Sequence, residues 1–385
     1  MNPVRSSLMK ESFTSHRGFP LVRESSNGVN ILGIGIIFSR GLGIDCYENA
    51  LNEGWQMPAL VESLCSKGKK SLAYRVDLES VPDRTLLKKM RRSDKFSKMA
   101  VLAASDALKG RETEKIDRKG IGIILATAFG AHVTTFDFLD NILDYGEAGV
   151  SPTTFSNSVH NAAASYIASS LDIKGPTLTI TRFDFPFQYA MQLAQIWLNE
   201  GRCEYVLAGV VEQYGDVMGY IYDKKVAPAH DGMIRPFNFN PANQVPGEGA
   251  VFFFLSKKGS ENLFCKIEDV SINEESKYTS LADLNIIDAD GMLNNEADYR
   301  TAIFHNVPVA AYSPLFGSMM IGSAFTCAAG ALMLKNQMRY ASPVTDNPYG
   351  INILKITGRS DIERICCTKY NCYREKAVVC LKKFI

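Results

Sequence analysis

The sequence has no excess of charge of either sign. Its 42 Lys and Arg are matched by 41 Asp and Glu over 385 residues, which leaves a net charge of +1. A protein that binds nucleic acid over a wide surface needs a clear excess of Lys and Arg, so we expect no nucleic-acid partner. Paired cysteines are also lacking: the nine are scattered, odd in number and never spaced as CxxC. They predict reduced thiols, as in cytoplasmic proteins, and neither a disulfide framework nor a zinc site.

The chain has little that suggests export or a membrane. Residues 1–26 are polar and rich in Ser and Arg, without the apolar core of a secretory signal, and we expect residues 1–28 to be a flexible extension. Val307–Leu334 carries no formal charge, but Pro308, Pro314 and Gly317 interrupt it. Because Pro and Gly break a helix into pieces, this stretch predicts a buried strand, a loop and a helix, in a cytoplasmic protein that has no membrane partner.

Nucleotide and metalloprotease motifs are absent. There is no Walker A sequence and no HExxH, and Gly33-Ile34-Gly35 lacks the third glycine of a dinucleotide-binding loop, since Phe38 stands there. We therefore expect no cofactor bound by this chain itself.

Strands and helices alternate along the chain. Long apolar runs such as Asn30–Phe38 and Gly120–Ala126 predict strands that are buried on both faces. The pattern begins again after a polar linker at Ser256–Asn262. We therefore predict an α/β fold with a mostly parallel sheet, duplicated in an N-terminal half at 29–256 and a C-terminal half at 263–385.

Most elements are predicted from apolar periodicity, β-rich composition and end signals. Further strands are expected at Thr177–Thr181, Tyr205–Val211, Val251–Leu255, Phe264–Ile272, Val307–Ala311 and Ala377–Leu381. Helices are expected at Asp45–Glu53, Asp94–Lys109, Phe136–Tyr145, Asn161–Leu171, Pro186–Asn199 and Phe325–Lys335.

One run of charge leaves two interpretations open. Lys88–Lys95 (KKMRRSDK) holds five Lys and Arg. It is either a solvated loop before a helix or a patch that docks an acidic partner and speeds association.

Three segments resemble the β-ketoacyl synthases. Met90–Leu108 resembles the segment that opens the acyl-binding half of these enzymes, and Val150–Thr181 resembles their next stretch, from a Ser-Pro turn to the nucleophile strand. Arg235–Ala250 (RPFNFNPANQVPGEGA) is similar to their RPFD…GEGA turn. The resemblance implies the thiolase fold, with two related α/β halves in five layers, working as a dimer.

The same comparison shows replaced catalytic groups. The nucleophilic Cys of the family matches Asp184, the two His match Asp290 and Ser318, and the family's Lys matches Ser313. The glycine-rich gate near the C-terminus is shortened to Asn371–Lys376. A thiolate at a helix start and two histidines are what condensation requires, so the resemblance implies a chain that is not an enzyme on its own.

One branch of the family is similar in this respect: the chain length factors of type II polyketide synthases. The resemblance implies a heterodimer with an active ketosynthase, in which this subunit shapes the tunnel that sets the length of a poly-β-keto chain. An acyl carrier protein is the other expected partner and brings the phosphopantetheine. The usual chain length factor has Gln where this chain has Asp184, which leaves both an aromatic polyketide, which we favour, and a polyene-type product open.

Tunnel residues follow by position from the resemblance. Phe129 aligns with the acyl-pocket gate, and the segment after it lines the length-setting region. The residues expected to line the tunnel are Phe129, His132, Thr135, Phe136, Leu139 and Thr154. Ordinary core packing is the alternative for this set. Two other functions also stay open: an acyltransferase or decarboxylase with unconventional residues, and a standalone acyl-binding protein.

Overall fold

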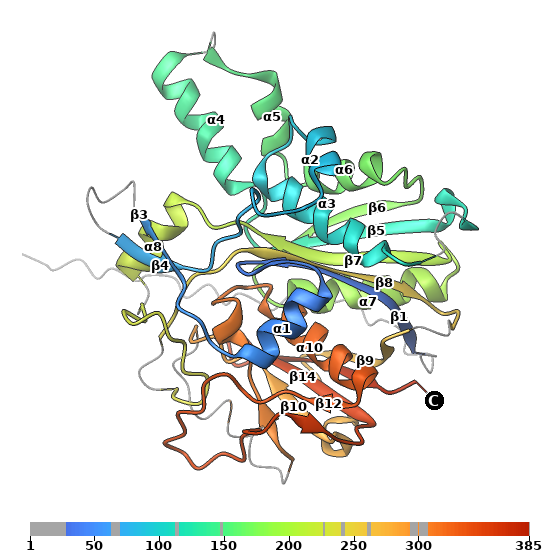
Figure 1. Ribbon diagram of the computed structural model, residues 1–385. Helices are drawn as coiled ribbons and strands as arrows, with labels where there is room; N and C mark the ends of the chain where they lie inside the picture. Colours follow the sequence, from blue (N-terminus) through green and yellow to red (C-terminus); the bar gives the residue numbers. More distant parts are fainter. Residues whose placement is uncertain are drawn as a thin grey trace, which may run out of the picture.

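The computed structural model describes residues 28–62, 70–111, 115–146, 149–225, 228–239, 243–259, 263–292, 299 and 307–384. Within them, one mixed sheet runs through the molecule (Figure 1). Helices lie on its outer face and between its first and second parts. This confirms the α/β class. The predicted extension at 1–28 lies outside the described residues, apart from Gly28.

The first part of the sheet carries the N-terminal strands. In sheet order they are β6 (Thr177–Thr181), β5 (Ile121–Thr127), β7 (Tyr205–Glu212), β8 (Gly249–Ser256) and β1 (Val29–Phe38), with the short β2 (Gly41–Leu42) beside β1. β5 is parallel to both β6 and β7, whereas β8 is antiparallel to β7 and β1. Strand β6 is at the end of this order, so only one of its edges is paired within the described chain.

The second part of the sheet continues from β1 without a break. Its strands, again in order, are β9 (Cys265–Ile272), β15 (Lys376–Lys382), β14 (Arg364–Tyr370), β10 (Leu284–Ile287) and β11 (Val309–Ala310). β9 is antiparallel to β1 and β15, and β14 to β15, while β10 is parallel to β14 and β11.

Helices form layers on the two parts of the sheet. α3 (Lys95–Leu108) and α6 (Ala162–Ser170) cover the outer face of the first part, and α7 (Pro186–Asn199) and α10 (Gly322–Asn336) contact strands of both parts from between them. These are four of the five layers that the resemblance implies. A second outer helix layer is not formed by the described residues, and most of 293–306 is outside them.

The remaining elements lie around this core. They are α1 (Ile44–Glu53), the hairpin β3 (Ala59–Glu62) and β4 (Lys70–Ala73), α2 (Arg84–Lys89), α4 (His132–Tyr145), α5 (Pro152–Ser158), α8 (Asp216–Lys225) and the pair β12 (Met338–Arg339) and β13 (Gly358–Arg359). Helices α4 and α5 pack on each other and project from the body of the molecule (Figure 1).

The two glycines of β1 serve helix packing. A Cβ added to Gly33 would lie 2.0 Å from the carbonyl oxygen of Ala107, and one added to Gly35 would lie 2.0 Å from that of Ala103. Helix α3 can therefore approach the strand closely, which only glycine permits. This packing explains the Gly-Ile-Gly sequence without a nucleotide.

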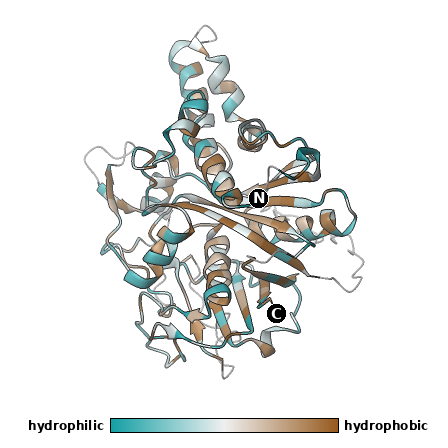
Figure 2. Cartoon of the chain, turned by 45° about the vertical axis from the view of Figure 1, so that its right-hand side comes forward, coloured by the Kyte–Doolittle hydropathy of each residue, from teal (hydrophilic) through white to brown (hydrophobic). Residues whose placement is uncertain are grey.

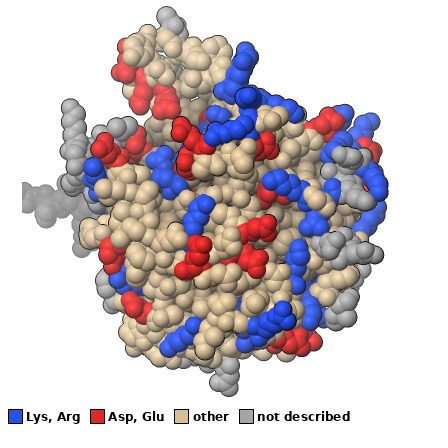
Figure 3. Space-filling view, in the orientation of Figure 1, with Lys and Arg blue, Asp and Glu red and all other residues tan. Residues whose placement is uncertain are grey.

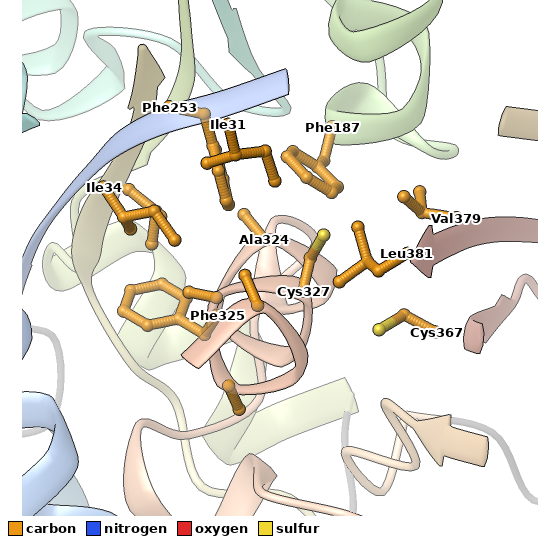
Figure 4. Packing of buried hydrophobic residues seen from close by; sticks show 14 of the residues in the cluster. Ile31, Ile34, Phe187, Phe253, Ala324, Phe325, Cys327, Cys367, Val379 and Leu381 are labelled. Atoms are coloured by element: carbon orange, nitrogen blue, oxygen red, sulfur yellow. The ribbon is translucent and has the colours of Figure 1, made fainter. Parts of the chain in front are cut away.

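The largest core cluster lies between the two parts of the sheet. Helix α10 is buried on all sides from Gly322 to Leu334, and Ala324, Phe325 and Cys327 face strand and helix residues there (Figure 4). Hydrophobic residues are concentrated on the strands of the sheet (Figure 2). A helix that is apolar all round is a buried one, so the uncharged stretch up to Leu334 is core, as predicted.

Two sequence-based expectations about the sheet and the thiols are wrong. The sheet is mixed, because the strands around β1, β8, β9 and β15 are antiparallel. Continuous apolar runs report burial on both faces, and the helix layers bury antiparallel strands here just as they would parallel ones. In addition, Cys366 and Cys380 form a disulfide, because the antiparallel register sets them directly opposite each other with Cα atoms 4.3 Å apart.

Element boundaries show smaller differences. Helix α4 begins at His132, four residues before the predicted start, and the strand expected at 307–311 is reduced to β11. The shortened gate segment forms the tight turn between β14 and β15, where Oδ1 of Asn371 accepts hydrogen bonds from the backbone N–H groups of Tyr373 and Glu375.

Candidate functional site

The four replaced positions converge in space. Oγ of Ser318 donates to the carbonyl oxygen of Asp290, and Oγ of Ser313 donates to that of Ala289 at 3.2 Å. Asp184 follows β6 in the turn before α7, close enough to the same centre to influence the pKa of Lys369. The structure thus brings Asp184, Asp290, Ser318 and Ser313 to one place, although they are distant in sequence.

A buried lysine occupies this centre. Nζ of Lys369, on β14, lies 2.5 Å from Oδ2 of Asp288 and 3.9 Å from Oδ2 of Asp290, and Oη of Tyr299 donates to Asp288. Burial alone would lower the pKa of Lys369, but the carboxylates of Asp288 and Asp290 outweigh it and raise the pKa. The lysine therefore stays charged. Burial raises the pKa of Asp290 to about 7, although Lys369 acts in the opposite direction.

Sequence reasoning missed Lys369 and Asp288. The available signal was Lys369 itself, which follows the mostly apolar run Ile365–Thr368, because a buried lysine is almost always paired. Lys369 and Asp288 therefore form a buried ion pair next to Asp290, one of the replaced catalytic positions.

The backbone is strained next to Asp184. Phe185, the residue before α7, has a φ of 53° and is buried. A bulky side chain in the left-handed region costs about 1 kcal/mol or more. This conformation turns the chain sharply from β6 into α7, so that Asp184 is at the start of the helix.

A cavity of about 260 Å³ opens beside the centre. Its walls come from the end of β7, from α8, and from the segments around Pro246 and Ser318. The lining residues are Phe129, Glu212, Gln213, Tyr214, Met218, Ile221, Tyr222, Gln244, Pro246, Gly247, Met292, Ser318, Met319 and Met320. Two predicted site residues, Phe129 and Ser318, are among them.

Glu248, in the GEGA turn, holds the elements around this cavity together. Its buried carboxylate accepts hydrogen bonds from the backbone N–H groups of Val76 at 2.8 Å and Tyr214 at 3.0 Å. It also pairs with Arg75 at 3.0 Å and with Lys95. One side chain thus ties α3 and the segment after β4 to the end of β7, which explains why the turn carries an acid.

A family model described as "Beta-ketoacyl synthase, N-terminal domain" matches residues 26–260. The chain belongs to the β-ketoacyl synthase family.

Curated relatives in this family are distant. The chain is 23% identical over 190 residues to the chloroplastic 3-oxoacyl-[acyl-carrier-protein] synthase I of Arabidopsis thaliana. The aligned region covers 48% of this chain and 40% of the relative. The chain is 25% identical over 230 residues to nodulation protein E of Rhizobium leguminosarum bv. trifolii, covering 58% and 56%. The chain thus spans about half the length of the curated relatives it matches.

Solved structures of ketosynthases share the fold over nearly the whole chain. The ishigamide ketosynthase/chain length factor superposes with a TM-score of 0.76 at 16% identity, covering 93% of this chain and 99% of that one. The structure titled "AntDE:AntF (apo): type II PKS acyl-carrier protein in complex with its ketosynthase bound to the hexaketide" gives a TM-score of 0.75 at 14% identity, covering 93% and 99%. The thiolase-like ketosynthase fold is therefore established.

The predicted tunnel residues of this ketosynthase-family chain lie in two settings. Phe129 lines the cavity and stacks edge-on against Phe183 and His132, at 5.3 and 5.9 Å between ring centroids. Burial lowers the pKa of His132, so its ring is neutral at pH 7. Oγ1 of Thr135 lies 3.0 Å from the carbonyl oxygens of both Ala131 and Ser158 and shares its one proton between them, which places α4 against the end of α5.

The other three predicted tunnel residues are on the projecting helices. Phe136 and Leu139 are 40% and 45% exposed on α4, and Thr154 is half-buried on α5. None of the three lines the cavity of the isolated chain. Their role as tunnel wall stays a prediction.

Exposed apolar side chains are concentrated in this region. Of the sixteen large hydrophobic side chains that are exposed in the described ranges, eight lie between residues 136 and 183. We call these eight the apolar face: Phe136, Leu139, Leu143, Tyr145, Phe155, Val159, Leu178 and Phe183. The contact between Phe129 and Phe183 links the segment after β6 to the loop between β5 and α4. An exposed apolar area of this kind marks an interaction surface.

The described residues offer neither a metal-binding cluster nor a membrane-spanning helix. Among the residues described, no group of three or more His, Cys, Asp and Glu is arranged to hold a metal ion. In the same residues, every helix is too short or too polar to cross a bilayer.

Proposed function

We propose that this chain is a non-catalytic subunit of a type II polyketide synthase, equivalent to a chain length factor. The observation that carries the proposal is the set of replaced positions: Asp184, Asp290, Ser318 and Ser313 stand where the family has Cys, two His and Lys, and they gather around Lys369. A carboxylate is a much weaker nucleophile toward thioesters than a thiolate, and Asp290 and Ser318 stand at the two positions where the family has its assisting histidines.

An active ketosynthase is the proposed partner. The apolar face supports it, and so does the second edge of β6, which pairs with no strand of the described residues, because an open strand edge beside exposed apolar residues invites pairing with another chain. The similarity in fold to the ishigamide ketosynthase/chain length factor also supports this assembly.

An acyl carrier protein is the proposed second partner, and it would supply the phosphopantetheine. Cationic side chains gather over α2, beside the projecting helices (Figure 3). They include the exposed Arg84, Lys88, Lys89, Arg91 and Arg92. Such a patch would attract an acidic carrier protein and speed its association. This favours docking over the solvated-loop interpretation of the charge run.

The tunnel residues are assigned a length-setting role. In the complex, Phe129, Phe136 and Leu139 would stand between the ketosynthase and this subunit, where side-chain volume limits how far the chain can grow. An aromatic polyketide is the favoured product, with a polyene-type product as the alternative.

The test compares the chain alone with its complex. The purified subunit alone should neither decarboxylate malonyl-carrier protein nor condense it, whereas a one-to-one complex with the ketosynthase should produce a polyketide. Malonyl consumption by the subunit alone would instead indicate an active acyltransferase or decarboxylase.

A standalone acyl-binding protein is the second candidate, and the cavity beside Ser318 favours it. Sedimentation separates the two candidates. A stable monomer or homodimer that does not pair with the ketosynthase would support the acyl-binding protein.

A further inference from the structure

A second cavity, of about 300 Å³, lies beside β1, where the first part of the sheet meets the second. It is enclosed by the end of α3, the start of α1, the segment before β9 and the last turn of α10. It shares no lining residue with the cavity beside Ser318. A ligand bound here would therefore not occupy the position of the replaced catalytic groups.

Charged side chains make up much of its lining. Five of the twelve lining residues are charged: Asp45, Asp106, Lys109, Arg111 and Lys335. Lys109 pairs with Asp106 at 3.2 Å. With three cations against two acids, the cavity has an excess of positive charge and attracts an anionic group.

Two of the cations lie beside the same aromatic ring. Nζ of Lys335 is 4.1 Å and Cζ of Arg111 is 6.0 Å from the centre of the Phe264 ring. Burial lowers the pKa of Lys335, and the charge of Arg111 lowers it further, although Asp45 and Glu48 act in the opposite direction. Within the described ranges, Lys335 has no carboxylate partner. An oxyanion between the two cations would relieve their repulsion and accept hydrogen bonds from both.

The acids supply acceptors on the same walls. The side chain of Asp106 is 9% exposed, and its Oδ2 has no hydrogen-bond partner among the described residues. Both of its carboxyl oxygens lie 3.8 Å from the position that a Cβ on Gly43 would take, so the carboxyl group is between two lining residues, Gly43 and Lys109. Asp45 is exposed in the first turn of α1. Carboxylates accept hydrogen bonds from hydroxyl groups, so the cavity suits a ligand that carries hydroxyls as well as an anion.

We propose that this cavity binds a small phosphorylated polyol. Lys335 and Arg111 hold the phosphate, because two cations match the charge of its dianion and a guanidinium can bind it through two parallel hydrogen bonds. Asp106 and Asp45 accept hydrogen bonds from the hydroxyl groups. Since Arg111 and Lys335 come from opposite parts of the chain, the bound ligand also stabilises the folded protein. Neither the site nor its ligand depends on the proposed function.

The test uses three probes: glycerol 3-phosphate, inorganic phosphate and glycerol. Binding is measured by calorimetry at constant ionic strength on the full-length chain, kept with its partner subunit if it needs one. Lys335→Met removes the cation, and Lys335→Arg keeps it. Lys98→Met is the matched control, since Lys98 is on α3 but outside the lining. Comparing the two methionine variants subtracts binding by the partner or by other basic surfaces.

We expect glycerol 3-phosphate to bind the wild type, Lys335→Arg and Lys98→Met alike, and to bind Lys335→Met about tenfold more weakly. Inorganic phosphate should bind more weakly than glycerol 3-phosphate, and glycerol should not bind measurably. Glycerol 3-phosphate should also raise the Tm of Lys98→Met more than that of Lys335→Met. If Lys335 only complements the C-terminal end of α10, its substitution would change the Tm without ligand and leave the shift caused by the ligand unchanged.

Three results would overturn the assignment of this cavity. They are equal binding of glycerol 3-phosphate to Lys335→Met and Lys98→Met, binding of glycerol as tight as that of glycerol 3-phosphate, and binding of inorganic phosphate as tight as that of glycerol 3-phosphate. None of these measurements depends on polyketide production or on pairing with a ketosynthase.

Discussion

Leu143 offers a direct test of the proposed interface. It is on α4 and is 81% exposed in the isolated chain. Fully burying a leucine stabilises by roughly 1.5–3 kcal/mol, so covering the exposed part would contribute about 1–2.5 kcal/mol to the complex. Leu143→Gln removes this contribution and covers an amide instead, at little cost in helix propensity. Since about 1.4 kcal/mol is a factor of ten, the dissociation constant of the ketosynthase complex should rise by about tenfold.

The assay is a titration of the ketosynthase with each purified variant, with circular dichroism to check folding. Leu281→Gln is the matched control, because Leu281 is 58% exposed but is outside the apolar face, between β9 and β10. It should leave the dissociation constant unchanged. If the two variants bind equally well, the partner does not cover α4 and the reasoning about the apolar face is wrong.

Four further predictions follow from the site. Lys369→Met leaves Asp288 buried without its partner and should lower the free energy of unfolding by about 3–5 kcal/mol. The loss should be smaller in the double variant that also carries Asp288→Asn. Equal losses for the single and the double variant in urea titrations would count against the ion pair. The pKa of Glu212 in the folded protein, about 7, exceeds that of an unfolded glutamate, so the native state binds more protons between these two pH values. The free energy of unfolding should therefore fall by up to about 3 kcal/mol as pH rises from about 4 to 7. Glu212→Gln should flatten this pH dependence in unfolding curves. Asp184→Cys should not condense malonyl-carrier protein, since one restored group does not replace a cooperating set, and turnover like that of an active ketosynthase would contradict this. Phe129→Ala or Leu139→Ala should lengthen the product of the complex by one or more two-carbon units, because packing relaxes only partly around a deletion, whereas Thr135→Trp should shorten it; unchanged product masses in all three would assign these residues to packing.

Local sequence patterns predicted most of the N-terminal elements. Asn30–Phe38, Thr177–Thr181 and Pro186–Asn199 all agree with the structure to within a residue, because apolar periodicity and a proline at a helix start are local signals. Strands β10 and β14 were missed. Strand β10 is short and contains the polar Asn285, and β14 contains Lys369, whose partners Asp288 and Asp290 are distant in sequence.

The candidate site was predictable only in part. The resemblance gave Asp184, Asp290, Ser318 and Ser313, and the structure brings these four together. It gave no sign of Lys369, because the carboxylates that pair with it come from another element. It also gave no sign of Glu212, because the lack of a partner for Oε2 among the described residues is visible only in the structure. For the same reason, the parallel or antiparallel direction of each strand could not be inferred from its apolar pattern.

The position of α10 has a consequence for how the protein folds. This helix has no face that tolerates water, and it is enclosed by strands from both parts of the sheet. Either part alone would expose α10 or the surface that covers it, so we expect the two parts to fold together and not as separate domains. Strand β1 also links the two parts, because it pairs with β8 of the first part and with β9 of the second.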